Sequence, residues 1–191
     1  MEVFLKKYID DFSDLIITSK EITDDLISVK EALVRASKNG RKSIVVGNGG
    51  SASIASHVAV DLTKNAKTQC IDFNEADLIT CFANDYGYEH WVEKAVGFYG
   101  NEGDILVAIS SSGCSDNILK GCQEARRKNF SKIITLSGMS SDNPLRKLGD
   151  INLWVDSRAY NHIESIHQFW LLCVVDMIIG KAEYSADPSD A

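Results

Sequence analysis

A glycine-rich turn is the first stretch of the chain whose residue types suggest chemistry. It reads Gly47-Asn48-Gly49-Gly50-Ser51 and follows the apolar residues 44–46, which predict a short buried strand. Three glycines within four residues indicate a tight turn with bare backbone. We expect Ser51 to cap the helix that follows. Free N–H groups and the positive end of the helix dipole then favour a bound anion at this turn.

Two other interpretations also fit this turn. The spacing Gly47-x-Gly49-x-x-Ala52, with Asp72 about where a ribose-binding acid stands, matches a dinucleotide fingerprint. The turn can equally be purely structural. Further along the predicted helix over 51–65, His57 and Asp61 are four residues apart and share a face. That pair would extend an anion site with groups that can carry protons or bind a metal.

A serine-rich loop provides a second candidate for anion binding. The apolar run 104–109 predicts a strand covered on both faces, and a helix to about Lys128 follows the loop. Between them lie four serines, whose hydroxyl groups can donate to anionic oxygens: Ser110, Ser111, Ser112 and Ser115. Serine-rich loops are often only loops. The position between a strand end and a helix start favours a phosphate site.

The composition is that of an ordinary soluble domain. At 191 residues the chain predicts one domain, 1–191, and its net charge of −7 argues against a general nucleic-acid surface. Five cysteines without a C-x-x-C pair indicate reduced thiols in a cytoplasm and no zinc finger. We expect no membrane span and no signal peptide, because no apolar run approaches 18 residues and charge begins at Glu2.

The elements that must position these loops can be read from periodicity. Residues 3–38 predict a helical arm with one apolar stripe and a break near Ser19–Thr23. This arm can form a subunit interface, which we favour, or pack on its own domain. The remaining predicted strands are 70–73, 132–136 and 151–155, and the remaining predicted helices are 75–83, 89–98, a short one from Pro144, and 161–179. Residues 84–88 read as a turn, and 181–191 read as a polar tail.

Strands that alternate with helices predict an α/β fold. We expect a three-layer α/β/α sandwich with a five-stranded parallel sheet, preceded by the N-terminal helical arm. In such sheets ligands bind beyond the carboxyl ends of the strands, where the glycine turn and the serine loop would both lie.

Five motifs, in order along the chain, carry a family resemblance. They are residues 46–51, Asn84-Asp85-Tyr86-Gly87, residues 103–106, residues 109–115, and Ile163-Glu164-Ser165-Ile166-His167. With these the chain resembles the sugar-isomerase (SIS) domain family, and within it the sedoheptulose-7-phosphate isomerase branch, also called phosphoheptose isomerases. The resemblance spans nearly the whole chain and displaces the dinucleotide interpretation, so no nucleotide cofactor is expected.

The resemblance implies an enzyme that converts a ketose phosphate to an aldose phosphate through an enediol. It implies a homotetramer with sites between subunits, no membrane and no direct nucleic-acid partner. The serine loop, with Ser110, Ser111, Ser112 and Ser115, would hold the sugar phosphate. The glycine turn, with Asn48, Gly49, Gly50 and Ser51, and the separate residue Asp85 would bind the sugar.

The sequence departs from the family at the acid–base positions. The family glutamate is Asp61 here, the family glutamine is Glu164, and the catalytic histidine is Leu172. The aspartate that precedes the last helix is Asn161. Leucine cannot transfer a proton, and a positioned acid or base contributes roughly 10²–10⁴-fold to a rate. Asp61 and Glu164 are therefore the candidate catalytic pair.

Many family members hold a zinc ion beside these groups. In this chain His57, Asp61 and Glu164 would supply one nitrogen and two carboxylates, an open three-ligand set. The alternative is that the same side chains line a polar pocket without metal. For the whole protein, the alternative to an isomerase is a non-catalytic relative: a regulator that binds a replication initiator, or a sugar-phosphate sensor. The intact phosphate loops favour the isomerase.

Overall fold

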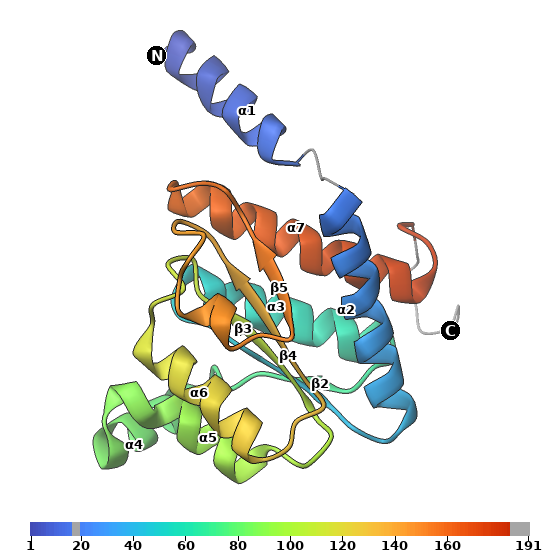
Figure 1. Cartoon of the computed structure of the whole chain (residues 1–191), viewed down its shortest axis with the longest axis vertical. Coiled ribbons are helices and arrows are strands. Elements are labelled where there is room, and N and C mark those ends of the chain that lie inside the picture. Colours follow the sequence, from blue (N-terminus) through green and yellow to red (C-terminus); the bar gives the residue numbers. More distant parts are fainter. Residues whose placement is uncertain (17–19, 184–191) are drawn as a thin grey trace.

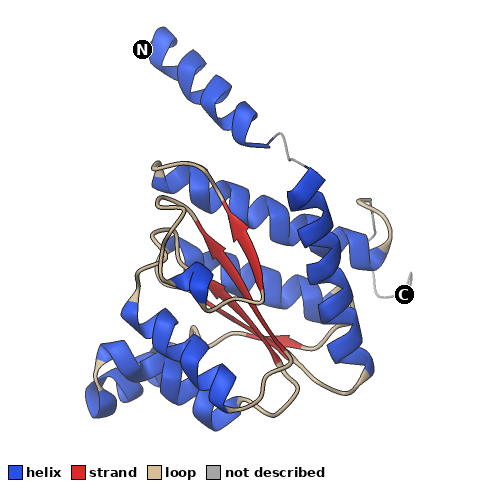
Figure 2. Ribbon diagram, in the orientation of Figure 1, coloured by secondary structure: helices blue, strands red, loops and turns tan. Residues whose placement is uncertain are grey.

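A parallel sheet forms the centre of the computed structural model, which describes residues 1–16 and 20–183 (Figure 1, Figure 2). The strands are β1 (Ser43–Val46), β2 (Cys70–Ile71), β3 (Ile105–Ile109), β4 (Lys132–Ser137) and β5 (Ile151–Trp154). The helices are α1 (Glu2–Ile16), α2 (Lys20–Lys38), α3 (Gly50–Lys64), α4 (Ala76–Tyr86), α5 (Trp91–Tyr99), α6 (Asp116–Arg127) and α7 (Tyr160–Ile179), with the 3-10 helices η1 (Tyr88–His90) and η2 (Leu145–Lys147).

The strand order places the two candidate loops side by side. The strands run β2-β1-β3-β4-β5 and every pair is parallel. Val46 at the end of β1 pairs with Ala108 near the end of β3, so the glycine turn and the serine loop leave the same edge of the sheet. The predicted five-stranded parallel sheet is confirmed.

Side chains of the strands pack alternately into two hydrophobic cores, because successive residues of a strand point to opposite faces of the sheet. Val45 and Val107 pack in the core formed with α2, α3 and α7, whereas Ile44 and Leu106 pack in the core formed with α5 and α6. Figure 1 shows these two groups of helices on opposite sides of the sheet. The three-layer prediction is therefore confirmed, and α3 lies beside α7 on one face.

Helix α1 extends away from the rest of the molecule as an arm (Figure 1). None of its residues is buried, and Val3, Phe4 and Ile9 are more than half exposed. The arm contacts α7 through Tyr8 and Phe12, whose rings lie 4.2 and 5.5 Å from the ring of His162. An apolar stripe left this exposed is typical of a helix that packs on another chain. Its role as a subunit interface stays a prediction.

Helix α7 is long and apolar enough, by length and composition, to cross a membrane, although its apolar residues are interrupted by polar and charged ones. Here it packs against α2 and α3, and eight of its residues are buried. This is the pattern of a core helix in an α/β domain.

Two predicted boundaries were wrong. The helix after the glycine turn begins at Gly50 rather than after a Ser51 cap, because Gly49 takes the N-cap position and Ser51 is buried in the first turn. The predicted turn over 84–88 is helical as far as Tyr86, whose ring contacts that of Phe82 one turn earlier, and Gly87 then ends the helix with a φ of 89°.

Two further predicted boundaries differ from the structure or fall partly outside it. Strand β2 is two residues shorter than predicted, since only Cys70 and Ile71 pair with β1. The predicted break near Ser19–Thr23 lies partly outside the described residues, and α2 is already helical at Lys20.

A buried histidine makes the fold sensitive to acid. His167 is fully buried, its Nε2 lies 3.1 Å from the Ser137 carbonyl oxygen, and burial lowers its pKa to about 4. The unfolded chain takes up this proton near pH 6.5, whereas the folded chain does so only near pH 4. The stability contributed by neutral His167 is therefore complete above pH 6.5 and is lost as the pH falls toward 4. We expect about 3 kcal/mol of unfolding free energy to be lost from this group.

Urea unfolding at pH 7 and pH 4.5 measures this loss. The His167→Gln variant is the control, since its amide can still donate to the Ser137 carbonyl but does not titrate. If the His167→Gln variant lost as much stability between pH 7 and pH 4.5 as the native protein, the acid sensitivity would belong to other groups.

Candidate active site

The glycine turn after β1 requires glycine at two positions. Gly49 has a φ of 56°, a left-handed conformation that favours glycine. A Cβ on Gly47 would lie 2.6 Å from the backbone carbonyl group of Ser51. The turn closes with the Ser51 N–H donating to the Asn48 carbonyl at 3.0 Å. This geometry sets the N-terminus of α3 against the end of β1, where the helix dipole favours an anion.

The serine loop folds as a compact turn at the neighbouring strand end. The Gly113 N–H donates to the Ser110 carbonyl at 2.9 Å, and the hydroxyl groups of Ser110 and Ser115 lie 3.0 Å apart. The hydroxyl of Ser111 is buried and has no hydrogen-bond partner among the residues that the structure describes. A buried hydroxyl without a partner is costly, so a ligand oxygen that accepts or donates a hydrogen bond there is favoured. The loop thus has the groups that a phosphate needs.

The segment that follows β4 forms hydrogen bonds with the serine loop. Gly138 donates its N–H to the Ser111 carbonyl at 3.0 Å, and Leu145 donates to the Gly113 carbonyl at 3.1 Å. Asn143 is buried and donates from Nδ2 to the Ser137 hydroxyl at 3.0 Å. Sequence reasoning missed Asn143, since one asparagine before a proline is also an ordinary turn signal.

The two candidate loops are joined by an amide pair. Asn48 in the glycine turn and Asn117 in the first turn of α6 exchange two hydrogen bonds between their carboxamides, each 2.9 Å long. The Tyr88 hydroxyl of η1 also donates to Asn48 Oδ1, at 3.1 Å. Asn117 and Tyr88 were not predicted as site residues. One feature of the sequence could have indicated Asn117. It lies in the first turn of the helix after the serine loop, and that loop follows β3, the strand adjacent to β1.

A cavity of about 420 Å³ opens between α3 and α7, next to the glycine turn. Its wall includes His57 from α3 and Glu164 and Gln168 from α7. Gly50, the first residue of α3, also lines it, and a Cβ at that position would overlap the Glu164 carboxylate. The structure therefore brings the predicted residues Glu164 and His57 into one cavity, which Gly50 at the end of the glycine turn also lines.

Asp61 lies one turn beyond His57 and is mostly buried. Its Oδ2 lies 3.4 Å from His57 Nε2, and its Oδ1 accepts a hydrogen bond from Asn65 Nδ2 at 3.0 Å. His57 Nδ1 lies 3.0 Å from Gln168 Nε2, so both ring nitrogens of His57 face protein groups. This pattern fits an Nδ1 acceptor and an Nε2–H directed at Asp61.

The predicted zinc ligands are not gathered into one set. Within the part of the chain that the structure describes, no three His, Cys, Asp or Glu side chains lie close enough together to hold a metal ion. His57 and Asp61 face each other, and the third member of the predicted set, Glu164, lies against Gly50 at the start of α3. The side chains as they stand do not fit a zinc site.

Asp85 is not among the residues that line the cavity between α3 and α7. It is exposed on α4, where its carboxylate accepts a hydrogen bond from Asn84 at 2.9 Å and lies 3.7 Å from Cys81 Sγ. The other histidines also lie elsewhere: His162 packs on the arm, His167 is in the core, and His90 belongs to a charged network between α5 and α6.

Comparison with known proteins assigns the family. A family model described as SIS domain matches residues 7–138. The chain belongs to the SIS-domain family. A phosphoheptose isomerase from Hamiltonella defensa subsp. Acyrthosiphon pisum is 38% identical over 160 residues, which cover 78% of this chain and 77% of that protein.

Solved structures of SIS-domain proteins agree with this assignment. The phosphoheptose isomerase of Francisella tularensis has 31% identity and a TM-score of 0.81, covering 93% of this chain and 98% of that one. The phosphoheptose isomerase from Neisseria gonorrhoeae has 25% identity and a TM-score of 0.81, covering 92% and 99%. The resemblance seen in the sequence is confirmed, and the names of these relatives support the enzymatic over the non-catalytic prediction.

Leu172, where the SIS-domain resemblance implies a histidine, packs partly buried against the core. It lies one helical turn beyond Gln168 on α7, as Asp61 lies one turn beyond His57 on α3. The cavity of this SIS-domain protein is therefore polar around Glu164, His57 and Gln168, and Leu172 packs against the core beyond it.

Proposed function

We propose that the chain isomerises sedoheptulose 7-phosphate, a ketose phosphate, to the corresponding aldose phosphate. The observation that carries this proposal is the cavity between α3 and α7. It places Glu164 and His57 beside Gly50, which belongs both to the cavity wall and to the glycine turn. The isomerase names of the relatives support the sugar-phosphate class, and those relatives named phosphoheptose isomerase support a seven-carbon substrate.

Binding divides between the two loops. The serine loop binds the phosphate through the hydroxyl groups of Ser110, Ser111, Ser112 and Ser115. The partnerless hydroxyl of Ser111 and the hydroxyl pair of Ser110 and Ser115 support this assignment. Asn48, Gly49, Gly50 and Ser51 bind the sugar from the glycine turn. Hydroxyl and backbone N–H donors suit an anion without adding a charge.

The chemistry needs one proton moved between two carbons and another between two oxygens. The Glu164 carboxylate takes the proton from C1 of the open-chain ketose, which forms an enediol, and returns it to C2, which forms the aldose. Meanwhile the oxygen on C2 gains a proton and the hydroxyl on C1 loses one. Asp61, the other member of the candidate catalytic pair, carries that second proton. His57, whose Nε2 lies 3.4 Å from Asp61 Oδ2 and whose Nδ1 faces Gln168, orients this carboxylate.

We propose that the working unit is a homotetramer with sites shared between subunits. The exposed apolar arm α1 supports this proposal. Asp85, which is exposed and does not line the cavity between α3 and α7, would bind sugar at such a shared site. We assign the protein to the cytoplasm. All five cysteines lie among the described residues and are free thiols, which suits a reducing compartment.

Sedoheptulose 7-phosphate in deuterated water, followed by NMR, tests the proposed function. We expect an aldose product that carries deuterium at C2. In the Asp61→Asn variant we expect turnover to fall roughly 10²-fold or more, because an amide cannot take up and return a proton as a carboxylate does. The matched control is Asp142→Asn, which neutralises an exposed carboxylate paired with Lys147. Unchanged turnover in Asp61→Asn would remove Asp61 from the mechanism, and no exchange in the native protein would refute the isomerase.

A further inference from the structure

Two side chains outside the predicted site converge on Asn48, the sugar-facing residue of the glycine turn. We propose that Asn117 and Tyr88 are positioning residues that fix the Asn48 carboxamide, so that its one uncommitted N–H points at the bound sugar. This inference rests on the proposed function, because it assumes that Asn48 contacts a sugar phosphate.

The hydrogen bonds around Asn48 account for nearly all of its carboxamide. Its Oδ1 accepts from Asn117 Nδ2 at 2.9 Å and from the Tyr88 hydroxyl at 3.1 Å. One of its two N–H groups donates to Asn117 Oδ1 at 2.9 Å. A carboxamide has two acceptor lone pairs and two donors, so one N–H remains for a ligand. Its direction follows from the other three bonds.

The two partners differ in burial, which separates their roles. Asn117 is only 3% exposed and lies at the start of α6, directly after the serine loop. It therefore ties the sugar-binding turn to the phosphate-binding loop. Tyr88 is 55% exposed, so its hydroxyl reaches Asn48 from the open side of the site. Removal of that hydroxyl should cost the fold little.

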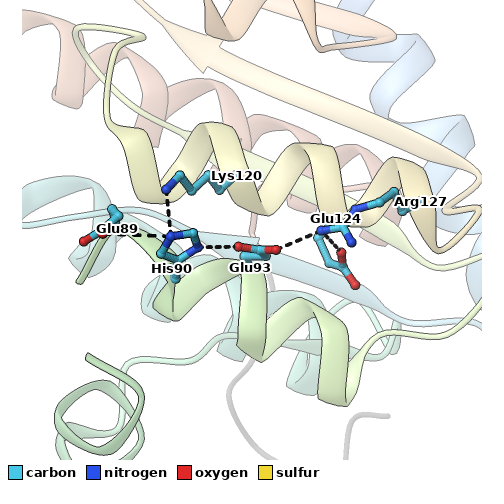
Figure 3. Close-up of polar contacts among 6 residues, drawn as sticks. All are labelled: Glu89, His90, Glu93, Lys120, Glu124 and Arg127. Carbon is cyan, nitrogen blue, oxygen red and sulfur yellow. Dashed lines mark hydrogen bonds and ion pairs between the residues drawn. The ribbon is translucent and has the colours of Figure 1, made fainter. Parts of the chain in front are cut away.

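A charged network joins η1, the 3-10 helix that carries Tyr88, to α5 and α6 (Figure 3). His90, two residues further along η1, lies between two neighbours: its Nε2 is 3.0 Å from Lys120 Nζ and its Nδ1 is 2.6 Å from Glu93 Oε2. Glu93 continues the network to Arg127 of α6, at 2.8 Å. Hydrogen bonding with His90 lowers the pKa of Glu93, so this carboxylate stays charged.

Lys120 and Asn117 are three residues apart on α6 and therefore lie on the same side of the helix. The helix thus anchors η1 through Lys120 and orients Asn48 through Asn117. Tyr88 and Asn117 reach the same carboxamide from one connected unit, and this unit keeps the geometry of Asn48 constant. The Asn48–Asn117 pair alone would suffice to join the two loops. The additional hydrogen bond from the Tyr88 hydroxyl to Asn48 Oδ1 therefore points to orientation of the carboxamide.

A double-mutant cycle with Asn48 tests the proposal. The probes are sedoheptulose 7-phosphate and inorganic phosphate, and calorimetry gives the Kd of each for the full-length protein. We expect Tyr88→Phe to weaken sugar-phosphate binding about 3- to 10-fold, the usual range for one hydrogen bond, and Asn117→Ala to weaken it more. The Kd of inorganic phosphate should change less than about twofold, because the serine loop is intact. In an Asn48→Ala background both effects should disappear, since residues that act through one partner are not additive.

The matched control is Tyr99→Phe. It removes the hydroxyl group of another half-exposed tyrosine, whose ring packs on Phe73. It should leave both Kd values unchanged. Effects of Tyr88→Phe that persist in full in the Asn48→Ala background would overturn the proposal. So would equal losses of affinity for sugar phosphate and inorganic phosphate.

Hydrogen exchange of the amides of residues 49–52 supplies a readout that needs no substrate. We expect faster exchange there in Tyr88→Phe and Asn117→Ala, and native rates in Tyr99→Phe. If the native protein does not bind sedoheptulose 7-phosphate, the proposed function fails, while faster exchange still supports the positioning role. Unchanged exchange in both variants would refute that role whatever the substrate.

Discussion

Replacing Glu164 with glutamine is expected to lower kcat for sedoheptulose 7-phosphate by roughly 10²–10⁴-fold. The two side chains have nearly the same shape, and residue 164 lines the cavity beside the glycine turn. The amide cannot take a proton from carbon and return it, so the chemical step slows while the Kd of the substrate changes little. NMR in deuterated water gives the rate, and calorimetry gives the Kd.

Two further variants sharpen this experiment. Glu102→Gln neutralises an exposed carboxylate in the loop before β3 and should leave kcat unchanged. The SIS-domain pattern that the chain resembles has glutamine at position 164 and histidine at position 172. The double variant Glu164→Gln with Leu172→His should therefore recover part of the lost rate. Full activity in Glu164→Gln alone would show that this carboxylate does not transfer the proton.

Replacing Gly113 with alanine is expected to weaken binding of inorganic phosphate about tenfold or more and to lower the melting temperature. Gly113 has a φ of 67°, and this conformation costs a residue with a side chain about 1–2 kcal/mol. A Cβ there would also overlap the carboxamide of Asn143, which is 2% exposed and bonded within its own loop. Either the serine loop or the segment around Asn143 must move, which displaces the groups that bind phosphate. A loss of about 1.4 kcal/mol of binding free energy raises Kd tenfold.

Gly40→Ala is the matched control for this variant. Gly40 has a φ of 69°, and a Cβ there meets no atom within 4 Å. It therefore reports the cost of the left-handed backbone alone, far from the candidate site. Thermal unfolding should show a smaller loss in Gly40→Ala, and its Kd for phosphate should be native. Equal effects of the two substitutions would mean that the contact with Asn143 does not matter for binding.

Much of the architecture could be predicted because it depends on local patterns. Residues 105–109 are apolar without alternation, which a strand covered on both faces requires, and all five are buried. The side-by-side placement of the two loops follows from parallel strands that are adjacent in the sheet. His57 and Glu164 could be placed near one another because the family resemblance aligned two helices that are distant in sequence.

The remaining parts depend on contacts between distant segments. The amide pair of Asn48 and Asn117 joins residues 69 positions apart, and no local pattern distinguishes such an asparagine from one that faces solvent. The wrong Ser51 cap shows a different limit. Serine is a good N-cap by type, but Gly49 can adopt a left-handed φ and begins the helix earlier. Among the described residues the zinc candidates do not lie together as their side chains stand. Sequence spacing fixes the helix face that a residue occupies but not the direction of its carboxylate, so the zinc set stays a prediction.

The partnerless hydroxyl of Ser111 has a thermodynamic consequence. Among the described residues this buried group has no hydrogen-bond partner, whereas water can bond to it in the unfolded chain, and burying a hydroxyl unpaired costs about 1–3 kcal/mol. Under the proposed function, a phosphate oxygen would supply that hydrogen bond only in the folded state. Folding and phosphate binding would then be linked equilibria, and bound sugar phosphate would stabilise the folded chain.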